Sequence, residues 1–347
     1  MNTSYPRLRI AVVAPPWFEI PPLGYGGIEW LCHWLVEGLI DSGNQVTLVA
    51  SGSSPTRAEF LQTYRDPPSV RLGDPLPELL HAAIVDRELS DRDFDVIHDH
   101  SFAGPLLAGA RRAPTLVTAH GPVDGELAHY YARLHPRVRL VAISEAQRRW
   151  APELPWIATV HNSIPVADYP YAPEKERFVL FLGRMSPEKG AHLAIEAARD
   201  AGFPLVLAGK INESKEHAYF EAEVRPRLGP DIEWIGPANT ELKKDLLRRA
   251  RCLVFPIRWE EPFGIVMAEA MACGTPVVAL NRGSVSEVVE HDETGFICER
   301  PADLPEAIKR AELIEPAACR RRAERYFDVG AMVAKYEAVY REVAAAS

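Results

Sequence analysis

Short apolar segments alternate with helical segments along almost the whole chain, and this alternation restricts the fold more than any other feature. The first series of apolar segments comprises residues 9–14, 45–50, 95–100, 115–120 and 139–144. The second series comprises residues 178–183, 204–209, 232–236, 252–256 and 276–280. Apolar strands that alternate with helices are typical of parallel sheets covered by helices on both faces. The sequence therefore predicts an α/β protein with two doubly wound domains of similar size.

A segment rich in proline and charge separates the two series. It spans residues 165–177, PVADYPYAPEKER, and this composition is typical of a hinge between domains. A length of 347 residues also suits two domains. We therefore expect a first domain over residues 1–165 and a second domain over residues 166–328.

The remaining residues, 329–347, are predicted to form a C-terminal helix. Apolar side chains recur there at helical spacing, at Met332, Val333, Tyr336, Val339 and Tyr340. Such a stripe must be buried against another part of the protein.

Charge and cysteine content exclude several classes of protein. The net charge of −9 argues against a general nucleic-acid binder, because that affinity comes mainly from neutralising phosphates. The five cysteines include no CxxC pair, which disfavours a disulfide framework and a zinc site and favours a reducing compartment. The first apolar run is too short for a secretory signal, and no uncharged apolar stretch of membrane-spanning length follows. We therefore expect a cytoplasmic protein.

One basic segment qualifies this expectation. Residues 127–150 carry five arginines against one acidic residue, Glu145. A solvated face is the commoner explanation of such a segment, but contact with an anionic acceptor or with the inner face of a membrane is left open.

The loop after the first strand is rich in glycine. Gly24, Gly26 and Gly27 precede a helix that is expected to begin near Ile28, where backbone amides can approach an anion. A dinucleotide-binding GxGxxG would need a glycine where Glu29 stands and a shorter loop, so NAD binding is disfavoured. The alternative is a glycine-rich turn without a ligand.

His120 is the candidate functional histidine of the first half. It ends an apolar segment and is followed by Gly121 and Pro122, a turn that can open into a cleft. A structural role is the alternative for a lone histidine.

Two other polar groups could suggest a metal. Asp91 and Asp93 form a DxD, but they precede a strand and are interpreted as a solvated junction. His98 and His100 alternate onto one strand face beside Asp99, yet no convincing third ligand accompanies them. Packing or cleft-lining roles are favoured, and no metal site is predicted.

In the second half, two cations follow the strand FVLFLG. Arg184 and Lys189 lie in the turn RMSPEKG at the carboxyl end of that strand, beside a helix N-terminus. Arginine offers bidentate contacts and lysine a point charge, which suits a diphosphate. A positively charged surface turn is the alternative.

The segment EEPFGIVMAEAMACGTPVVAL follows the strand CLVFP and predicts a helix. Pro262 and Gly264 mark its start, and Gly274 and Pro276 mark its end. The amides of Gly264 and Ile265 would point out of the helix N-terminus toward a phosphate.

Two glutamates flank this helix start. Glu261 stands just before the helix and Glu269 lies within it, so their carboxylates could accept hydrogen bonds from the hydroxyls of a sugar and a ribose. Alternatively, Glu261 is a partner of the helix dipole and Glu269 is a surface residue. A carboxylate without a role would be costly in so apolar a helix, which favours function.

Together these motifs resemble the retaining glycosyltransferases of family 4. The resemblance covers nearly the whole chain, through GYGGIE at 24–29, AISEAQ at 142–147, HNSIP at 161–165, FLGRMSPEKG at 181–190, and the E-x7-E of Glu261 and Glu269. It implies the GT-B fold, in which two Rossmann-like domains face a cleft and the last helix returns to the first domain. The first domain, residues 1–165, would take the acceptor, and the second, residues 166–328, the nucleotide-sugar donor. It also implies transfer of a sugar from a nucleotide diphosphate with retention, without a bound metal or cofactor.

The resemblance further assigns roles to residues. By this similarity Arg184 and Lys189 hold the donor diphosphate, Glu261 the sugar hydroxyls and Glu269 the ribose. Backbone around the helix start binds phosphate, Gly26 and Gly27 lie over the donor phosphate or the acceptor, and His120 lies near the transferred sugar. The implied donor-binding residues at the helix start are Phe263, Gly264 and Ile265.

The substrates themselves stay open. The donor is a UDP-, GDP- or ADP-sugar, and the acceptor is a carbohydrate, a lipid-linked molecule or a small molecule. Trp17, Phe18 and Trp259 are candidate stacking surfaces for a sugar ring. The alternatives are a nucleotide-sugar 2-epimerase of the same architecture and a non-catalytic nucleotide-binding module. The sequence does not determine the oligomeric state.

Overall fold

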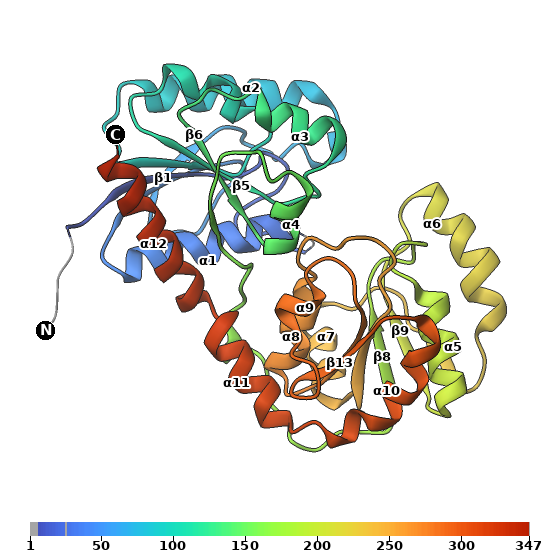
Figure 1. Cartoon of the computed structure of the whole chain (residues 1–347). Coiled ribbons are helices and arrows are strands. Elements are labelled where there is room, and N and C mark those ends of the chain that lie inside the picture. The colour runs from blue at the N-terminus through green and yellow to red at the C-terminus, as the bar shows by residue number, and fades with distance from the viewer. Residues whose placement is uncertain (1–5, 25, 347) are drawn as a thin grey trace, which may run out of the picture. The chain divides into compact units, whose positions relative to one another are not determined.

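The computed structural model describes residues 6–24 and 26–346, and the chain divides into two compact units. The first unit contains the chain up to Asn162 and again from Val329, and the second contains Ser163–Asp328 (Figure 1). The expected hinge, residues 165–177, lies inside the second unit. Its backbone is tied there, because Ala172 N donates to Cys273 O (3.3 Å) and Glu176 N donates to Arg249 O (2.7 Å).

The first unit is built on a seven-stranded parallel sheet with the order β3-β2-β1-β4-β5-β6-β7. Its strands are β1 (Arg9–Val13), β2 (Gln45–Ala50), β3 (Glu59–Gln62), β4 (Val96–Asp99), β5 (Thr115–Ala119), β6 (Val138–Ala142) and β7 (Trp156–Thr159). The sequence predicts all of these except β3 and β7. These two form the edges of the sheet and are only partly buried. β3 (EFLQ) lacks the continuous apolar run that identified the others, and β7 (WIAT) is apolar but short.

Helices cover both faces of this sheet. They are α1 (Gly27–Asp41), α2 (Pro75–Ser90), α3 (Gly125–Ala132), α4 (Glu145–Trp150) and α12 (Val329–Ala345). Successive side chains of β1 belong to different cores: Ile10 and Val12 pack with α1 and α12, whereas Ala11 and Val13 pack with α2. The sheet is therefore doubly wound.

Helix α12 belongs to the first unit although it follows the second unit in the sequence. The predicted stripe is buried, and Tyr340 is fully buried. α12 lies beside α1 so closely that a Cβ on Gly38 would meet Val333 Cγ2 at 2.5 Å (Figure 1). Two hydroxyls of α12 also reach the sheet, because Tyr340 bonds His98 Nδ1 (2.7 Å) and Tyr336 bonds Thr118 Oγ1 (2.8 Å).

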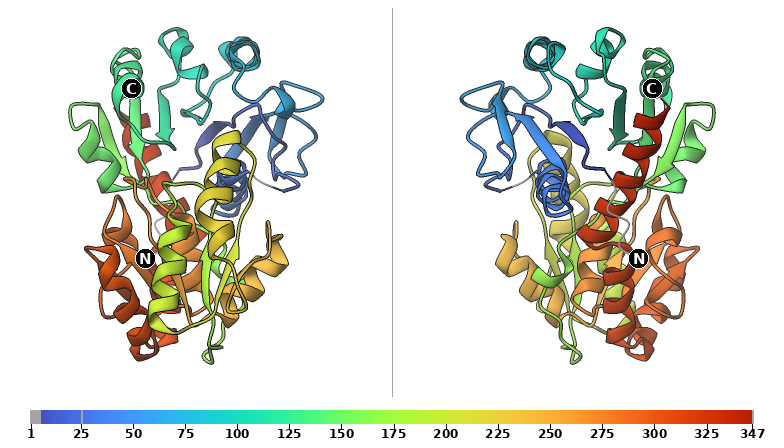
Figure 2. Two further views of the ribbon diagram at one scale, coloured as in Figure 1. Left: turned by 90° about the vertical axis from the view of Figure 1, so that its right-hand side faces the viewer. Right: turned by 90° about the vertical axis from the view of Figure 1, so that its left-hand side faces the viewer.

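The second unit contains a six-stranded parallel sheet with the order β10-β9-β8-β11-β12-β13. Its strands are β8 (Val179–Leu182), β9 (Leu205–Ala208), β10 (Ile232–Trp234), β11 (Cys252–Phe255), β12 (Val277–Leu280) and β13 (Gly295–Cys298). Its helices are α5 (Ala191–Ala201), α6 (Ser214–Tyr219), α7 (Thr240–Arg249), α8 (Ile265–Ala272), α9 (Val285–Val288), α10 (Leu304–Arg310) and α11 (Pro316–Tyr326). In the left view of Figure 2, α5 (lime green) and α6 (yellow) lie on the side of the second unit that faces the viewer. The Tyr219 hydroxyl joins them, because it accepts from His192 N (3.1 Å) and lies 2.6 Å from His192 Nδ1.

Each sheet has one point where the strand order reverses. In the first sheet β1 pairs with both β2 and β4, and in the second sheet β8 pairs with both β9 and β11. Ligands of open α/β sheets bind beyond the carboxyl ends of the strands at such a point. The residues that follow β1, β4, β8 and β11 are therefore the ones to examine.

In residues 6–24 and 26–346, no helix combines the length and the apolar character needed to span a membrane. All five cysteines are buried free thiols.

We expect that deletion of residues 330–347 will prevent the first unit from folding stably. The deletion removes six buried apolar side chains, each of which contributes about 1.5–3 kcal/mol, and their sum is comparable to the whole stability of a domain. Thermal melting and solubility of the truncated chain measure the effect.

A milder pair of variants tests the same contact. Tyr340→Phe leaves the buried His98 Nδ1 without its hydroxyl partner and should cost about 1–3 kcal/mol. Lys335→Ala, on the exposed face of α12, should leave the melting temperature unchanged. A stable, soluble truncation would show that α12 is dispensable.

Candidate functional site

Two loops meet at the carboxyl edge of the second sheet, where the strand order reverses. One loop follows β8 and carries Arg184 and Lys189, and the other follows β11 and carries Glu261. Gly283 permits the close packing of this edge, because a Cβ there would lie 2.2 Å from Glu261 O. The backbone of Glu261 is further fixed by Ser284 N, which donates to Glu261 O (3.0 Å).

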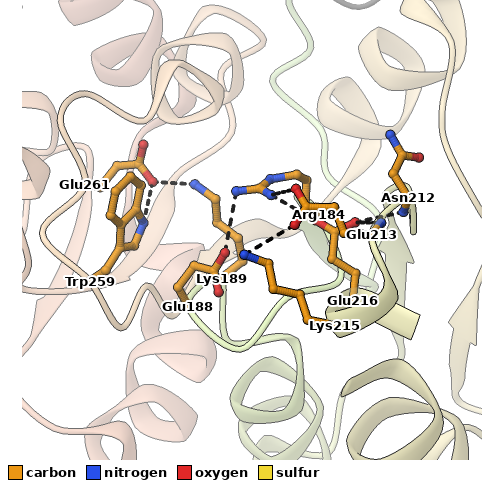
Figure 3. A network of polar contacts seen from close by, with 9 residues as sticks. All are labelled: Arg184, Glu188, Lys189, Asn212, Glu213, Lys215, Glu216, Trp259 and Glu261. Carbon is orange, nitrogen blue, oxygen red and sulfur yellow. Dashed lines mark hydrogen bonds and ion pairs between the residues drawn. The ribbon is translucent and has the colours of Figure 1, made fainter. Parts of the chain in front are cut away.

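Arg184 lies among three carboxylates. Its guanidinium contacts Glu216 at 2.9 Å, Glu188 at 3.5 Å and Glu213 at 3.8 Å (Figure 3). Burial alone would raise the pKa of Glu216, but amide donors at Asn212 and Glu213 and the Arg184 charge hold that pKa below its ordinary value. Arg184 is therefore paired with an ionised, buried carboxylate.

Lys189 is paired with Glu261. Its ammonium contacts Glu261 Oε2, which also accepts a hydrogen bond from Trp259 Nε1 (3.0 Å; Figure 3). The ammonium also lies 5.3 Å from the centre of the Trp259 ring, within the range of a cation–π contact. Glu261 is buried to 8% exposure, so its charge requires these donors.

Helix α8 begins as predicted, directly after Gly264. Gly264 has φ +68°, the left-handed conformation that favours glycine, and the chain enters the helix from there. The first turn of any α-helix leaves amide donors without acceptors inside the helix, which suits an anion. Phe263 is buried and Ile265 is half-buried, so at this helix start both would offer a ligand their backbone rather than an exposed side chain.

Glu269 is a buried member of α8, with 5% exposure, so the alternative that it is a surface residue is wrong. Its Oε1 accepts from the Tyr169 hydroxyl (2.8 Å) and contacts the Lys243 ammonium. Tyr169 precedes β8 and Lys243 lies on α7, so both partners come from outside α8.

The two glutamates share one arrangement. In each, a lysine and an aromatic donor contact the same carboxylate oxygen, Oε2 of Glu261 and Oε1 of Glu269. Within the described part of the chain, the second oxygen of each carboxylate is the one left to accept from a ligand. Each site thus has a fixed, charged acceptor.

Several of these partners were not predicted from the sequence. The partners of Arg184 and Glu269 lie far from the motifs along the chain, and only the fold brings them together. They are Glu213 and Glu216 beside Arg184, and Tyr169 and Lys243 beside Glu269. A sequence signal exists only for Glu213 and Glu216, which form a capping box at the start of α6.

In the first unit, Gly26 and Gly27 stand at the start of α1. Gly26 is the residue before the helix, and a Cβ there would lie 2.8 Å from Pro22 Cγ and 2.9 Å from Glu29 Oε2. A Cβ on Gly27 would meet no atom within 4 Å. Glu29 itself is buried, and burial raises its pKa. Gly26 is therefore required for packing, and Gly27 is not.

His120 follows β5 and pairs with a second histidine. His100 Nδ1 and His120 Nε2 lie 2.8 Å apart, and burial lowers the pKa of His120 to about 4. His98, by contrast, bonds Tyr340 with one ring nitrogen and Thr118 with the other (2.8 Å). Both nitrogens of His98 are occupied by protein hydroxyls, so it is a packing histidine, as favoured above.

The two aspartates of the DxD are not part of a metal site either. Asp91 and Asp93 are exposed between α2 and β4. Among the residues that the structure describes, no group of three or more His, Cys, Asp or Glu is arranged to hold a metal ion.

Comparison with known proteins accounts for both units. Residues 25–168 match the model of Glycosyltransferase Family 4, and residues 170–326 match the model of Glycosyl transferases group 1. A glycogen synthase of Mycobacterium tuberculosis is 27% identical over 91% of this chain and 88% of its own. A phosphatidyl-myo-inositol mannosyltransferase of Mycolicibacterium smegmatis is 26% identical over 83% of this chain and 80% of its own.

Solved structures agree. AviGT4, a glycosyltransferase involved in avilamycin A biosynthesis, is 27% identical and superposes with a TM-score of 0.75 over 98% of this chain and 99% of its own. The sucrose-phosphate synthase of Thermosynechococcus elongatus, at 20% identity, has the same fold, with a TM-score of 0.76 over 98% of this chain and 100% of its own. The predicted fold and family are thus confirmed: the chain is a glycosyltransferase of the family 4 type, with the GT-B fold.

Proposed function

We propose that this enzyme transfers a sugar from a nucleotide diphosphate to an acceptor hydroxyl with retention at the anomeric carbon and without a metal ion. The observation that carries the proposal is the meeting of Arg184, Lys189 and Glu261 at the edge between β8 and β11, just ahead of the N-terminus of α8. This is the position where a doubly wound sheet binds its ligand.

The leaving diphosphate needs positive charge, which a metal supplies in many transferases. Here Arg184 offers a bidentate donor, Lys189 offers a compact charge, and α8 offers amides at its first turn. Fixed donors of this kind stabilise charge that develops in the transition state without reorganising. These donors support the proposal that the nucleotide departs without a metal ion.

Glu261 fits the contact with the transferred sugar. A donor diphosphate would compete with Glu261 for the Lys189 ammonium, because both are anions. Trp259 Nε1 would continue to hold Oε2, which leaves the carboxylate free to accept from sugar hydroxyls through Oε1. Donor binding would thus exchange one ion pair for another and place a charged acceptor beside the reacting carbon.

Glu269 fits the ribose. Tyr169 and Lys243 hold its Oε1, which leaves Oε2 in a fixed position where it would accept from ribose hydroxyls.

His120 would lie near the transferred sugar as a neutral imidazole, because burial lowers its pKa to about 4. Gly26 and Gly27 would border the phosphate or the acceptor. The acceptor proton would leave on the departing phosphate on the same face of the sugar, so no covalent nucleophile is needed.

The first prediction concerns the reaction itself. Incubation with UDP-, GDP- and ADP-sugars should release nucleotide from one donor class, and the release should depend on a hydroxyl acceptor. NMR of the product should show the anomeric configuration of the donor. Conversion of the donor without an acceptor would indicate an epimerase, and an inverted product would contradict retention.

The second prediction concerns metal ions. EDTA should leave activity largely intact, because protein cations and helix amides stabilise the diphosphate. Initial rates with and without the chelator measure this. A complete loss of activity that Mg²⁺ or Mn²⁺ restores would contradict this prediction and would make Asp91 and Asp93 candidate metal ligands again.

The third prediction separates the two glutamates. Glu261→Gln should chiefly lower kcat, by about 100-fold, because it weakens a contact that orients the reacting sugar and balances its charge. Glu269→Gln should weaken binding of the free nucleotide diphosphate by about 1–3 kcal/mol, because it removes a charged acceptor for the ribose hydroxyls. Calorimetry and turnover at saturating donor measure the two effects.

Glu306→Gln, an exposed substitution in α10, serves as the matched control and should change neither quantity. Melting curves exclude a loss of fold in the two site variants. Loss of nucleotide affinity in Glu261→Gln alone would mean that the two ends of the donor are assigned the wrong way round.

A further inference from the structure

An apolar pocket in the first unit lies at the carboxyl edge of the first sheet, at the point where the strand order reverses. It has a volume of about 480 Å³ and is lined by residues that include Trp17, Leu72, Leu79, Phe102 and Leu106. Trp17 follows β1 and Phe102 follows β4, and these two strands are the neighbours at which the order reverses. A doubly wound sheet binds ligands at such an edge.

The walls of this pocket are held in place by a buried carboxylate. Glu78 of α2 is 8% exposed, and its Oε2 accepts from Phe102 N (3.2 Å) and Ala103 N (3.4 Å). The Trp17 side chain also donates to Glu78, so one carboxylate connects the wall after β1 to the wall after β4. Burial of a charge in apolar surroundings is costly without such donors, which indicates a built site.

Phe102 is supported from behind as well. Its ring stacks on that of Tyr130 at 4.7 Å, and the Tyr130 hydroxyl donates to Phe102 O. Phe102 nevertheless stays 54% exposed, as do Leu72 at 62% and Leu106 at 55%. Large apolar side chains that are held in place yet exposed around a concavity are typical of ligand sites.

The charges around the pocket select among ligands. Among the described residues that line it, the charged side chains are Asp74 and Glu78, and Asp74 is paired with Arg71 at 3.1 Å. An anionic ligand or an anionic bilayer surface would need lysine or arginine here. The lining therefore suits a neutral, apolar group.

We propose that this pocket binds the aglycone of the acceptor, and that the acceptor is a neutral molecule with an aromatic or branched aliphatic aglycone. This rests on the proposed function, because the acceptor is expected at the first unit. The pocket and His120 both lie at the carboxyl edge of the first sheet. An acceptor whose aglycone occupies the pocket would therefore extend its hydroxyl along that edge.

Binding of two matched probes to the full chain tests the proposal without requiring turnover. 2-Naphthylmethanol and 2-naphthoate share one ring system and differ in charge. Saturation-transfer NMR and calorimetry should show binding of the neutral probe, and the anion should bind at least about tenfold more weakly. Equal affinity for the two probes, or no binding of the neutral one, would overturn the proposal.

A pair of variants locates the binding. Leu106→Asp adds a carboxylate to the exposed wall of the pocket and should lower the affinity for 2-naphthylmethanol at least about tenfold. Leu313→Asp, at a leucine that is 70% exposed in the second unit, should leave the affinity unchanged. An unchanged affinity in Leu106→Asp would place the probe elsewhere and overturn the proposal.

Two further measurements distinguish other occupants. The full chain is also tested for association with neutral phosphatidylcholine vesicles and, by light scattering, for dimerisation. If Leu106→Asp abolishes either association while the soluble probe does not bind, the pocket serves that other occupant and the proposal is overturned. Nucleotide diphosphate affinity should be the same in Leu106→Asp and in the parent chain. Failure of nucleotide binding in the parent would instead contradict the proposed function, and the probe measurements would still stand.

Discussion

A carboxylate removed from water must be given charged or polar partners, and this constraint shapes the site on the second unit. Glu261 and Glu269 are both nearly buried, and each is held by a lysine and an aromatic donor on one oxygen. Without Lys189 and Lys243, each nearly buried carboxylate would lose its cationic partner, and its burial would be costly. The two ion pairs therefore fix the position of both carboxylates before a donor arrives.

The same pairing makes donor binding an exchange. Arg184 is surrounded by Glu188, Glu213 and Glu216, and Lys189 is paired with Glu261, so the cations that we assign to the diphosphate already have anionic partners. A diphosphate must replace part of this attraction, which lowers its net affinity. On the proposed assignment the exchange has a useful consequence, because the Glu261 charge, which Lys189 offsets in the free enzyme, would act fully on the sugar once the lysine turns to a phosphate. Binding energy is thereby used to prepare the reacting end of the site.

Sequence patterns predicted the buried parts of this fold and much less of its edges and pairings. Continuous apolar runs identified the central strands, and Gly264 and Gly274 located the ends of α8 within a residue or two. The edge strands β3, β7 and β13 were missed. β3 (EFLQ) lacks a continuous apolar run, and β7 (WIAT) and β13 (GFIC) are short apolar runs, which do not by themselves identify a strand. Lys243 and Tyr169 could not be assigned to Glu269, because residues far apart in sequence meet only through the packing of α7 and of the segment before β8.

The two units differ in the chemistry that they present at equivalent edges of their sheets. The second unit offers ion pairs and helix amides, which discriminate among ligands by charge and hydrogen bonding. The first unit offers a pocket of leucines and aromatic rings in which the charged lining residues are acidic, among those described. An anionic donor would find its partners at the second edge and would be disfavoured at the first by desolvation and by like charge. The opposite holds for a neutral acceptor, which gains little from lysine and arginine but loses water-exposed apolar surface in the pocket. Two sheets of the same topology can thus sort two substrates by polarity alone, before any contact specific to a particular sugar is made.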